Sequence, residues 1–246
     1  MRLKSIVKYY FSDIKNSVII FYLIIAAIAM LIGCSVTFAT ESNVEGTIGG
    51  GEMATVIFIF IVGLNSFKQN FLFLSVNNIP RTRQFQGFVL SALAVSGIMA
   101  AVDTTYASIL SEFVNYSSAF MQIYGDWITQ TSKPFVIATS FIWSTVLYMA
   151  AITGGYLITS LYYRMIKLLK IIVSIGVPVM LSIVLPAVDA TLAGGRIGKW
   201  LQEVLLVVGG LGNGINPYIA VLSLVVGTAV VAVLSFLLVR KAVVKE

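Results

Sequence analysis

Long uninterrupted apolar runs constrain this chain more than any other feature of its sequence. One run extends from Ser17 to about Phe38, and another from Pro217 to Val239. A helix needs about 20 apolar residues to cross the roughly 30 Å hydrocarbon core of a bilayer. Backbone groups in lipid must be hydrogen-bonded within the chain, and these runs lack the alternation of a β-barrel strand. The sequence therefore predicts an all-α integral membrane protein, in agreement with 59% hydrophobic and 11% charged residues.

Six such runs divide the chain into transmembrane spans. Their approximate bounds are 17–38, 53–67, 86–110, 134–162, 168–188 and 217–239. The second run looks short because polar residues follow from Asn65 to Asn70. Either this span bends there into a segment outside the bilayer, or it continues to Val76 with its polar residues facing protein or water. The fifth run contains Pro178 and Pro186, which should kink it because proline removes a helical hydrogen bond.

Basic residues gather on one side of these spans. Four precede span one, three lie between spans two and three, three between spans four and five, and three follow span six, which is 13 of 16. Only Lys133, Arg196 and Lys199 lie on the opposite side, together with seven of the ten acidic residues. The positive-inside rule then predicts that both termini are cytoplasmic. Topology accounts for the net charge of +6, so no nucleic-acid partner is expected.

Three segments outside the spans have their own patterns. Residues 1–16 combine basic residues with apolar ones at intervals of three and four, as in a helix on a membrane surface; a simple positive flank is the alternative. Residues 39–52 and 111–133 form outer loops, the first of them acidic and rich in glycine. Residues 189–216 contain an apolar stretch too short to cross a bilayer, which predicts a re-entrant or interfacial hairpin on the outer face.

Several chemical functions are disfavoured by the residues present. The chain has no histidine, which removes His-based metal sites and His-activated nucleophiles. Its one cysteine, Cys34, ends a sequence that fits a lipoprotein cleavage box, but the apolar run continues beyond it, so we interpret Cys34 as a small apolar residue. The stretch Gly194–Trp200 has the wrong spacing for a phosphate-binding loop.

Asp103 is the only carboxylate inside a predicted span. A proton or ion site is one interpretation of an acidic residue at this depth. A hydrogen-bonded carboxylate near the outer interface is the other, and we favour it because the sequence shows no second buried charge.

The cytoplasmic segment 68–85 is too apolar for a connection that only has to remain hydrated. Its apolar cluster consists of Phe71, Leu72, Phe73, Leu74, Val76 and Ile79, and Lys68, Arg81 and Arg83 flank it. Asn77 and Asn78 before Pro80 predict a turn, because asparagine tolerates left-handed backbone angles and proline fits the first position of a helix. An apolar patch with basic flanks predicts a docking surface for another protein.

Six spans, a basic N-terminal helix, this segment and the outer hairpin together resemble the permease subunit of an ATP-binding-cassette exporter of the type-two permease family. In that family the segment after span two reads apolar run, small residue, Ser-Arg, two residues and an aromatic. Here Asn78-Ile79-Pro80-Arg81-Thr82-Arg83-Gln84-Phe85 occupies the position, with Asn for the usual glycine and Pro for the usual serine.

The resemblance implies a bacterial plasma-membrane protein that is not itself an enzyme. It implies a dimer of identical or related permeases carrying two separate ATPase subunits, and the chain has no Walker motif of its own. ATP and Mg would bind the partner subunits, and this chain would bind no cofactor. The implied coupling residues are Phe71, Leu72, Phe73, Leu74, Val76, Asn78, Ile79, Pro80, Arg81 and Arg83. The implied residues of an outer gate or kink are Pro178, Pro186 and Trp200.

The cargo is weakly encoded. The path implied by the resemblance, along spans two and five, is apolar and suits an amphipathic peptide such as a bacteriocin, lantibiotic or toxin peptide. Drug or lipid extrusion by the same type of complex is the alternative. An ion-coupled carrier, which needs buried titratable groups, and a non-transporting scaffold remain as other classes.

Overall fold

Six helices long and apolar enough to cross a membrane are present in the part of the chain that the structure describes. The structure is a computed structural model, and it describes residues 3–39, 48–113, 116–212 and 214–242. The spans are Leu3–Leu31, Gly51–Val76, Arg81–Glu112, Lys133–Arg164, Lys167–Thr191 and Pro217–Arg240. The chain is therefore an all-α, multi-pass membrane protein, as its apolar runs predict.

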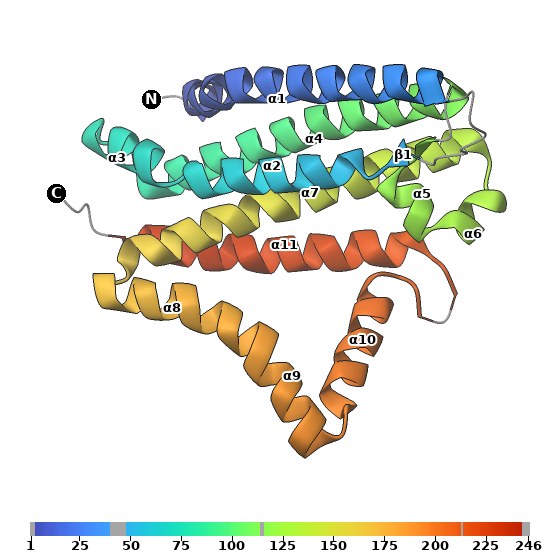
Figure 1. Cartoon of the computed structure of the whole chain (residues 1–246). Helices are drawn as coiled ribbons and strands as arrows, with labels where there is room; N and C mark the ends of the chain where they lie inside the picture. The colour runs from blue at the N-terminus through green and yellow to red at the C-terminus, as the bar shows by residue number, and fades with distance from the viewer. Residues whose placement is uncertain (1–2, 40–47, 114–115, 213, 243–246) are drawn as a thin grey trace.

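The first span and the basic segment before it form one helix, α1 (Leu3–Ala39). In Figure 1 its first turns, in dark blue, are seen nearly end-on, whereas the rest lies in the plane of the picture, so α1 bends in its N-terminal part. The apolar face expected there is present, since Ile6, Tyr10 and Ile14 are buried. This face packs on α4 (Arg81–Phe113), which the sequence did not indicate. A position in the membrane surface stays a prediction.

The second span is interrupted at the place where the sequence left its path open. Helix α2 (Gly51–Asn65) ends at a turn formed by Ser66 and Phe67, and α3 (Lys68–Val76) follows at once. The helix therefore breaks near Phe67 and the chain is helical again to Val76, and the point at which it leaves the bilayer stays a prediction. Helix α4 begins at Arg81, five residues before the expected start of the third span at Gln86, so most of segment 68–85 is helical.

Helix α7 (Lys133–Arg164) lies at the centre of the bundle and packs against α2, α4 and α11 (Pro217–Arg240). Gly63 of α2 faces the backbone of Ile152, and Gly155 of α7 faces the backbone of Phe60, so a side chain at either glycine would clash with a carbonyl oxygen. Helices in lipid associate by close packing, because no hydrophobic force drives them together. These two glycines let α2 and α7 approach each other closely.

The outer connection expected as a polar loop, 111–133, is partly folded. Short helices α5 (Ala119–Ile123) and α6 (Gly125–Thr129) pack through Phe120 and Tyr124 onto Trp143 of α7. A two-residue parallel ladder joins β1 (Ile48–Gly49) to β2 (Tyr116–Ser117), which no sequence pattern indicated. Of the acidic outer loop, Glu41 and Glu45 lie outside the described residues.

The fifth span diverges from the bundle (Figure 1). It runs through α8 (Lys167–Val179), a π-helical turn η2 (Met180–Val184), α9 (Leu185–Val188) and a second π-helical turn η3 (Asp189–Ala193). It is helical for five residues beyond the expected end at Val188. Helix α10 (Arg196–Val208) then turns back and leads to the start of α11. The chain therefore reverses direction between η3 and α10, as the expected hairpin 189–216 requires. The depth of this hairpin in a membrane stays a prediction.

The two ends of the bundle differ in composition. The start of α1, the end of α11 and α3 lie at one end, and β1, α5 and α6 lie at the other (Figure 1). Arg81 at the start of α4 donates a hydrogen bond to the carbonyl oxygen of Arg240 at the end of α11, 3.0 Å away. The basic residues of separate connections thus meet at one end, which we refer to as the basic end.

The contact between α2 and α7 gives a stability test with a neighbouring control. Alanine for glycine inside a helix normally stabilises by about 0.5–1 kcal/mol. Gly154→Ala should follow that rule, since a Cβ there meets nothing within 4 Å. Gly155→Ala should instead lower the free energy of unfolding by about 1–3 kcal/mol, because the added atom forces α2 away. Thermal unfolding of the two purified variants, followed by circular dichroism in detergent, measures the difference; equal melting temperatures would contradict the close approach.

Candidate functional site

The sequence assigns partner binding to residues 68–85, which hold α3, the turn after it and the start of α4. We include the two residues just before α3 and name residues 66–85 the elbow. Asn78 has a φ of 55°, the left-handed conformation that asparagine tolerates better than most residues. Pro80 immediately precedes α4, whereas the sequence predicted it at the first position of the helix. Its carbonyl accepts a hydrogen bond from the backbone amide of Gln84. The Gln84 side chain donates to the carbonyl of Ile79 at 2.8 Å, which closes the turn. The turn is thus held by its own backbone and side chains.

The structure divides the apolar cluster of the elbow into an inner and an outer part. Phe71, Leu74 and Ile79 are buried within the chain at 6% exposure or less. Phe73 and Val76 are 47% and 78% exposed. The buried half of the cluster faces the chain's own bundle, and the other half is accessible. The physical reason is helical periodicity: a nine-residue helix on a bundle must turn one face inward. Docking of a partner stays a prediction.

The remaining elbow residues of the prediction lie around this outer part. Leu72 is half-buried, whereas Asn78, Pro80 and Arg83 are exposed. The guanidinium of Arg81 lies 5.8 Å from the centre of the Phe71 ring, in addition to its bond to Arg240. Arg81 therefore ties the elbow to α11 as well as carrying charge. We name Phe73, Val76, Asn78, Pro80 and Arg83 the elbow surface.

Aromatic contacts join the elbow to two other helices. The Phe71 ring stacks on Phe67, 5.2 Å away, and both meet the Tyr163 ring of α7 edge-on. The Phe73 ring stacks on Tyr9 of α1 with centroids 4.8 Å apart. Such ring pairs contribute beyond their buried area and fix relative orientation. The elbow is thus joined to α1 through one face and to α7 through another.

The residues predicted for an outer gate are not brought together. Pro178 lies inside α8 and Pro186 at the start of α9, one on each side of the π-helical turn η2. The Ser182 hydroxyl bonds to the Pro178 carbonyl, so a side chain satisfies part of the disturbed ladder. Trp200 of α10 is 61% exposed. The predicted kink corresponds to the π-helical turn η2 between the two prolines. Pro178, Pro186 and Trp200 make no contact with one another that would close a gate.

The start of α10 is occupied by a side chain of the chain itself. Gly194 and Gly195 both have positive φ, which lets the chain turn sharply after η3. The Asp189 carboxylate accepts hydrogen bonds at 2.8 Å from the backbone amides of Ile197 and Gly198. A helix N-terminus attracts anions, and here the anion is Asp189. This geometry explains why the glycine-rich stretch does not present its amides to a phosphate.

Asp103 forms a polar hub that connects four helices. It lies in α4 and is 7% exposed. The Tyr22 hydroxyl of α1 donates to Oδ1 at 2.9 Å, the Tyr148 hydroxyl of α7 donates to Oδ2, and Thr55 of α2 is a further hydrogen-bonding neighbour. The favoured interpretation of Asp103 as a hydrogen-bonded carboxylate agrees with these contacts. Sequence reasoning missed its partners, because tyrosine in an apolar run is not distinguished from lipid-facing residues.

A second buried carboxylate lies near this hub, contrary to the expectation from sequence. Glu52 in the first turn of α2 is also 7% exposed, and its Oε2 accepts the backbone amide of Ala119 at 2.9 Å. The sequence placed Glu52 in the outer loop, but Ala119 of α5 and Tyr116 of β2 hydrogen-bond to its carboxylate. Burial, with the charge of Glu52 second, raises the pKa of the Tyr116 phenol in β2 well above its usual value.

The two halves of the elbow cluster lead to a matched pair of substitutions. Phe71→Ala should lower the free energy of unfolding by about 3 kcal/mol, since it empties a buried aromatic site. Phe73→Ala should lower it by about 1 kcal/mol, because the ring is half-exposed and loses mainly its stack on Tyr9. Chemical unfolding of the detergent-solubilised chain compares them. A larger loss for Phe73→Ala would overturn the assignment of inner and outer faces.

The hydrogen bonds of Asp103 lead to a second pair of substitutions, both in α7. Tyr148→Phe should cost about 1–2 kcal/mol, because it leaves one oxygen of a buried carboxylate without its donor. Tyr162→Phe on the same helix removes only an exposed hydrogen bond to Ser174 and should cost much less. Melting temperatures of both variants measure the effect, and indistinguishable values would argue against a structural hub.

Comparison of the chain with known proteins adds no assignment to these geometric findings. No protein-family model, no curated protein and no solved structure matches it.

Proposed function

We propose that this chain is the membrane-spanning permease subunit of an ATP-driven exporter of amphipathic peptides. The observation that carries the proposal is the two-faced elbow at the basic end. Its inner face is packed on α7 through Phe71. By contrast, Phe73, which also stacks on Tyr9 of α1, and Val76 are exposed, as is Arg83 in the first turn of α4. Exposed apolar side chains with a basic neighbour suit a protein partner, and the missing energy source suggests that this partner is a nucleotide-binding ATPase subunit.

The contacts of the elbow support a path for mechanical force. A push on Phe73 or Val76 moves α3, and the Phe67–Phe71–Tyr163 contacts pass that movement to α7. Helix α4 continues directly from the turn, and Arg81 ties its start to the end of α11. ATP-driven closure of two partner subunits would therefore rotate α3 and α4 with the bundle, because tightly packed elements move as units.

The proposal includes a second copy of the permease, identical or related. The fifth span is apolar, and none of the residues in its most hydrophobic window is buried within the chain. A second copy would cover part of this surface and leave a path between α2 of one protomer and α8–α9 of the other. That surface is rich in Ile, Val, Leu and Met, which favours amphipathic peptides as cargo and leaves apolar drugs or lipids as the alternative.

An ion-coupled carrier is the second candidate, and the buried pair of Asp103 and Glu52 favours it. However, both oxygens of Asp103 accept tyrosine hydroxyls, and Glu52 accepts the Ala119 amide. Carboxylates held in this way act as structural acceptors between helices. The hub therefore supports a rigid bundle driven from outside better than a site that must load and release an ion in every cycle.

Val76 gives the sharpest test of the proposed function. It is the most exposed large apolar residue of the elbow at 78%, so Val76→Asp should leave the fold intact. It should abolish co-purification of an ATPase subunit from native membranes and the ATPase activity that added peptide stimulates, since docking would bury the new charge. Mass spectrometry of the purified complex and phosphate release from proteoliposomes provide the readouts.

Gln130→Asp is the control for this variant. It adds the same charge to an exposed residue next to α6, at the opposite end of the bundle, and should retain both partner and stimulation. An unmodified chain that co-purifies with no ATPase subunit would contradict the proposal. So would a Val76→Asp variant with full peptide-stimulated activity.

A further inference from the structure

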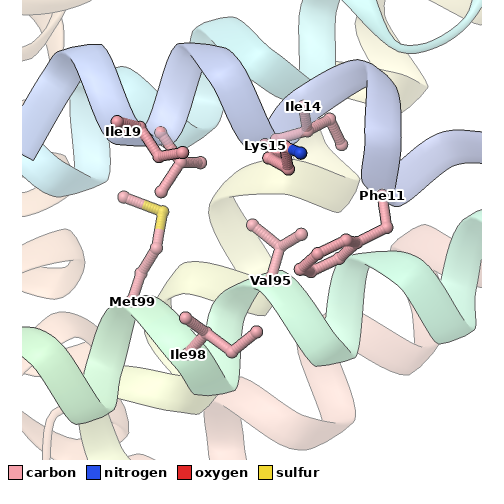
Figure 2. Close-up of a pocket in the computed structure, with 8 residues that line it drawn as sticks. Phe11, Ile14, Lys15, Ile19, Val95, Ile98 and Met99 are labelled. Atoms are coloured by element: carbon pink, nitrogen blue, oxygen red, sulfur yellow. The ribbon is translucent and has the colours of Figure 1, made fainter. Parts of the chain in front are cut away.

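An open groove lies between α1 and α4 on the side of the bundle away from α7 and α11 (Figure 2). It has a volume of about 220 Å³. Its lining residues, all from these two helices, are Phe11, Ile14, Lys15, Val18, Ile19, Val95, Ile98 and Met99. Figure 2 shows the side chains of the two helices facing each other across the gap. Ile19 and Ile98 at its rim are each about half-exposed, at 51% and 47%, so the groove is accessible from outside.

Two contacts join α1 to α4, one on each side of the groove. On one side of it, Ile6 of α1 packs directly against Gly87 of α4. On the other side, the Tyr22 hydroxyl bonds to the carbonyl of Met99 at 3.1 Å and to Asp103. Between these contacts the floor is formed by Ile14, Val95 and Met99, all below 8% exposure. The groove therefore lies between two contacts that fix α1 against α4.

The chemistry of the groove selects an apolar occupant. Seven of its eight lining residues are hydrophobic. An apolar cavity of roughly 150 Å³ in a protein stays dry and takes up hydrocarbon instead. The groove is open, but its lining offers water almost no polar partner, whereas a hydrocarbon chain can contact it along its length. The chain has six helices long and apolar enough to cross a membrane, so the hydrocarbon that such a groove would meet is a lipid acyl chain.

Lys15 adds a charge at one edge of this apolar surface. Its side chain is exposed, and within the described residues no carboxylate of the chain pairs with its ammonium group. Asp13, two residues earlier, lies toward α3, where the Asn70 amide approaches it at 3.4 Å. Lys15 also precedes the first long apolar run by two residues, or about 3 Å along a helix. A lysine that flanks an apolar run can extend its ammonium group toward lipid phosphates.

From this combination we infer that the groove binds one anionic phospholipid of the leaflet at the basic end. An acyl chain lies between α1 and α4 along Val95, Ile98 and Met99, and the headgroup phosphate pairs with Lys15. The lipid fills the gap between two helices that are also joined by the Asp103 hub, so it stabilises the attachment of α1 to the bundle. This inference rests on the groove alone and holds whether or not the chain is a permease.

Native mass spectrometry of the full-length, delipidated protein tests the inference. One molecule of phosphatidylglycerol should bind tightly to each protein chain. Phosphatidylcholine with the same acyl chains should bind more weakly, and glycerol phosphate, which has no acyl chain, should not bind. Lys15→Gln should lower the affinity for phosphatidylglycerol about fivefold, as expected for the loss of one basic residue near an anionic headgroup. Ile98→Trp should weaken both phospholipids, because the larger side chain fills the groove.

Lys8→Gln is the matched control, since Lys8 is an exposed lysine of α1 that does not line the groove. Lys8→Gln should leave the affinity for the one tightly bound phosphatidylglycerol unchanged. Equal weakening by Lys8→Gln and Lys15→Gln would mean diffuse attraction to the membrane surface and would overturn the inference. It would also fail if glycerol phosphate bound as tightly as phosphatidylglycerol, or if Ile98→Trp changed neither affinity.

Discussion

The packing of Phe67 and Phe71 against Tyr163 is the interaction on which the rest of this account depends. A surface that receives force is useful only if its other face is fixed to the part that must move. Here the turn from α2 to α4 inserts aromatic rings into the bundle, and Phe67 also meets Tyr156 edge-on. Tyr156 in turn stacks on Phe88 of α4 with centroids 3.8 Å apart. One continuous set of rings therefore connects the elbow with α4 and α7.

The same rigidity extends to the opposite end of the bundle. Close backbone contact at Gly63 and Gly155 joins α2 to α7, and the Asp103 hub brings α1, α2, α4 and α7 together. By contrast, α8 and α9 diverge from this core, and α10 turns back from them toward the start of α11 (Figure 1). The chain thus combines a rigid group of helices with a weakly attached fifth span. This contrast fits a machine in which one group moves relative to another, as our proposed function requires.

The sequence predicts the membrane spans well, because a bilayer imposes length and polarity on each helix separately. It does not predict how the spans contact each other. Tyr22 and Tyr148 count as ordinary residues of apolar runs, so their bonds to Asp103 give no signal in hydropathy. Glu52 looks like a loop residue until β1 and β2, which are far apart in sequence, pair beside it. The elbow cluster was recognised, but nine residues of α3 are too few for their pattern to separate a buried face from an exposed one.

Labelling of a single cysteine at the elbow tests the central claim most directly. In a Cys34→Ser background, Val76→Cys is treated with a membrane-impermeant maleimide, in intact cells and in inverted membrane vesicles. The account predicts labelling in inverted vesicles only, and protection there when the proposed ATPase subunit is bound. Labelling of Val76→Cys in intact cells would place the elbow outside the cell, beyond the reach of any ATP-driven partner, and would contradict the account.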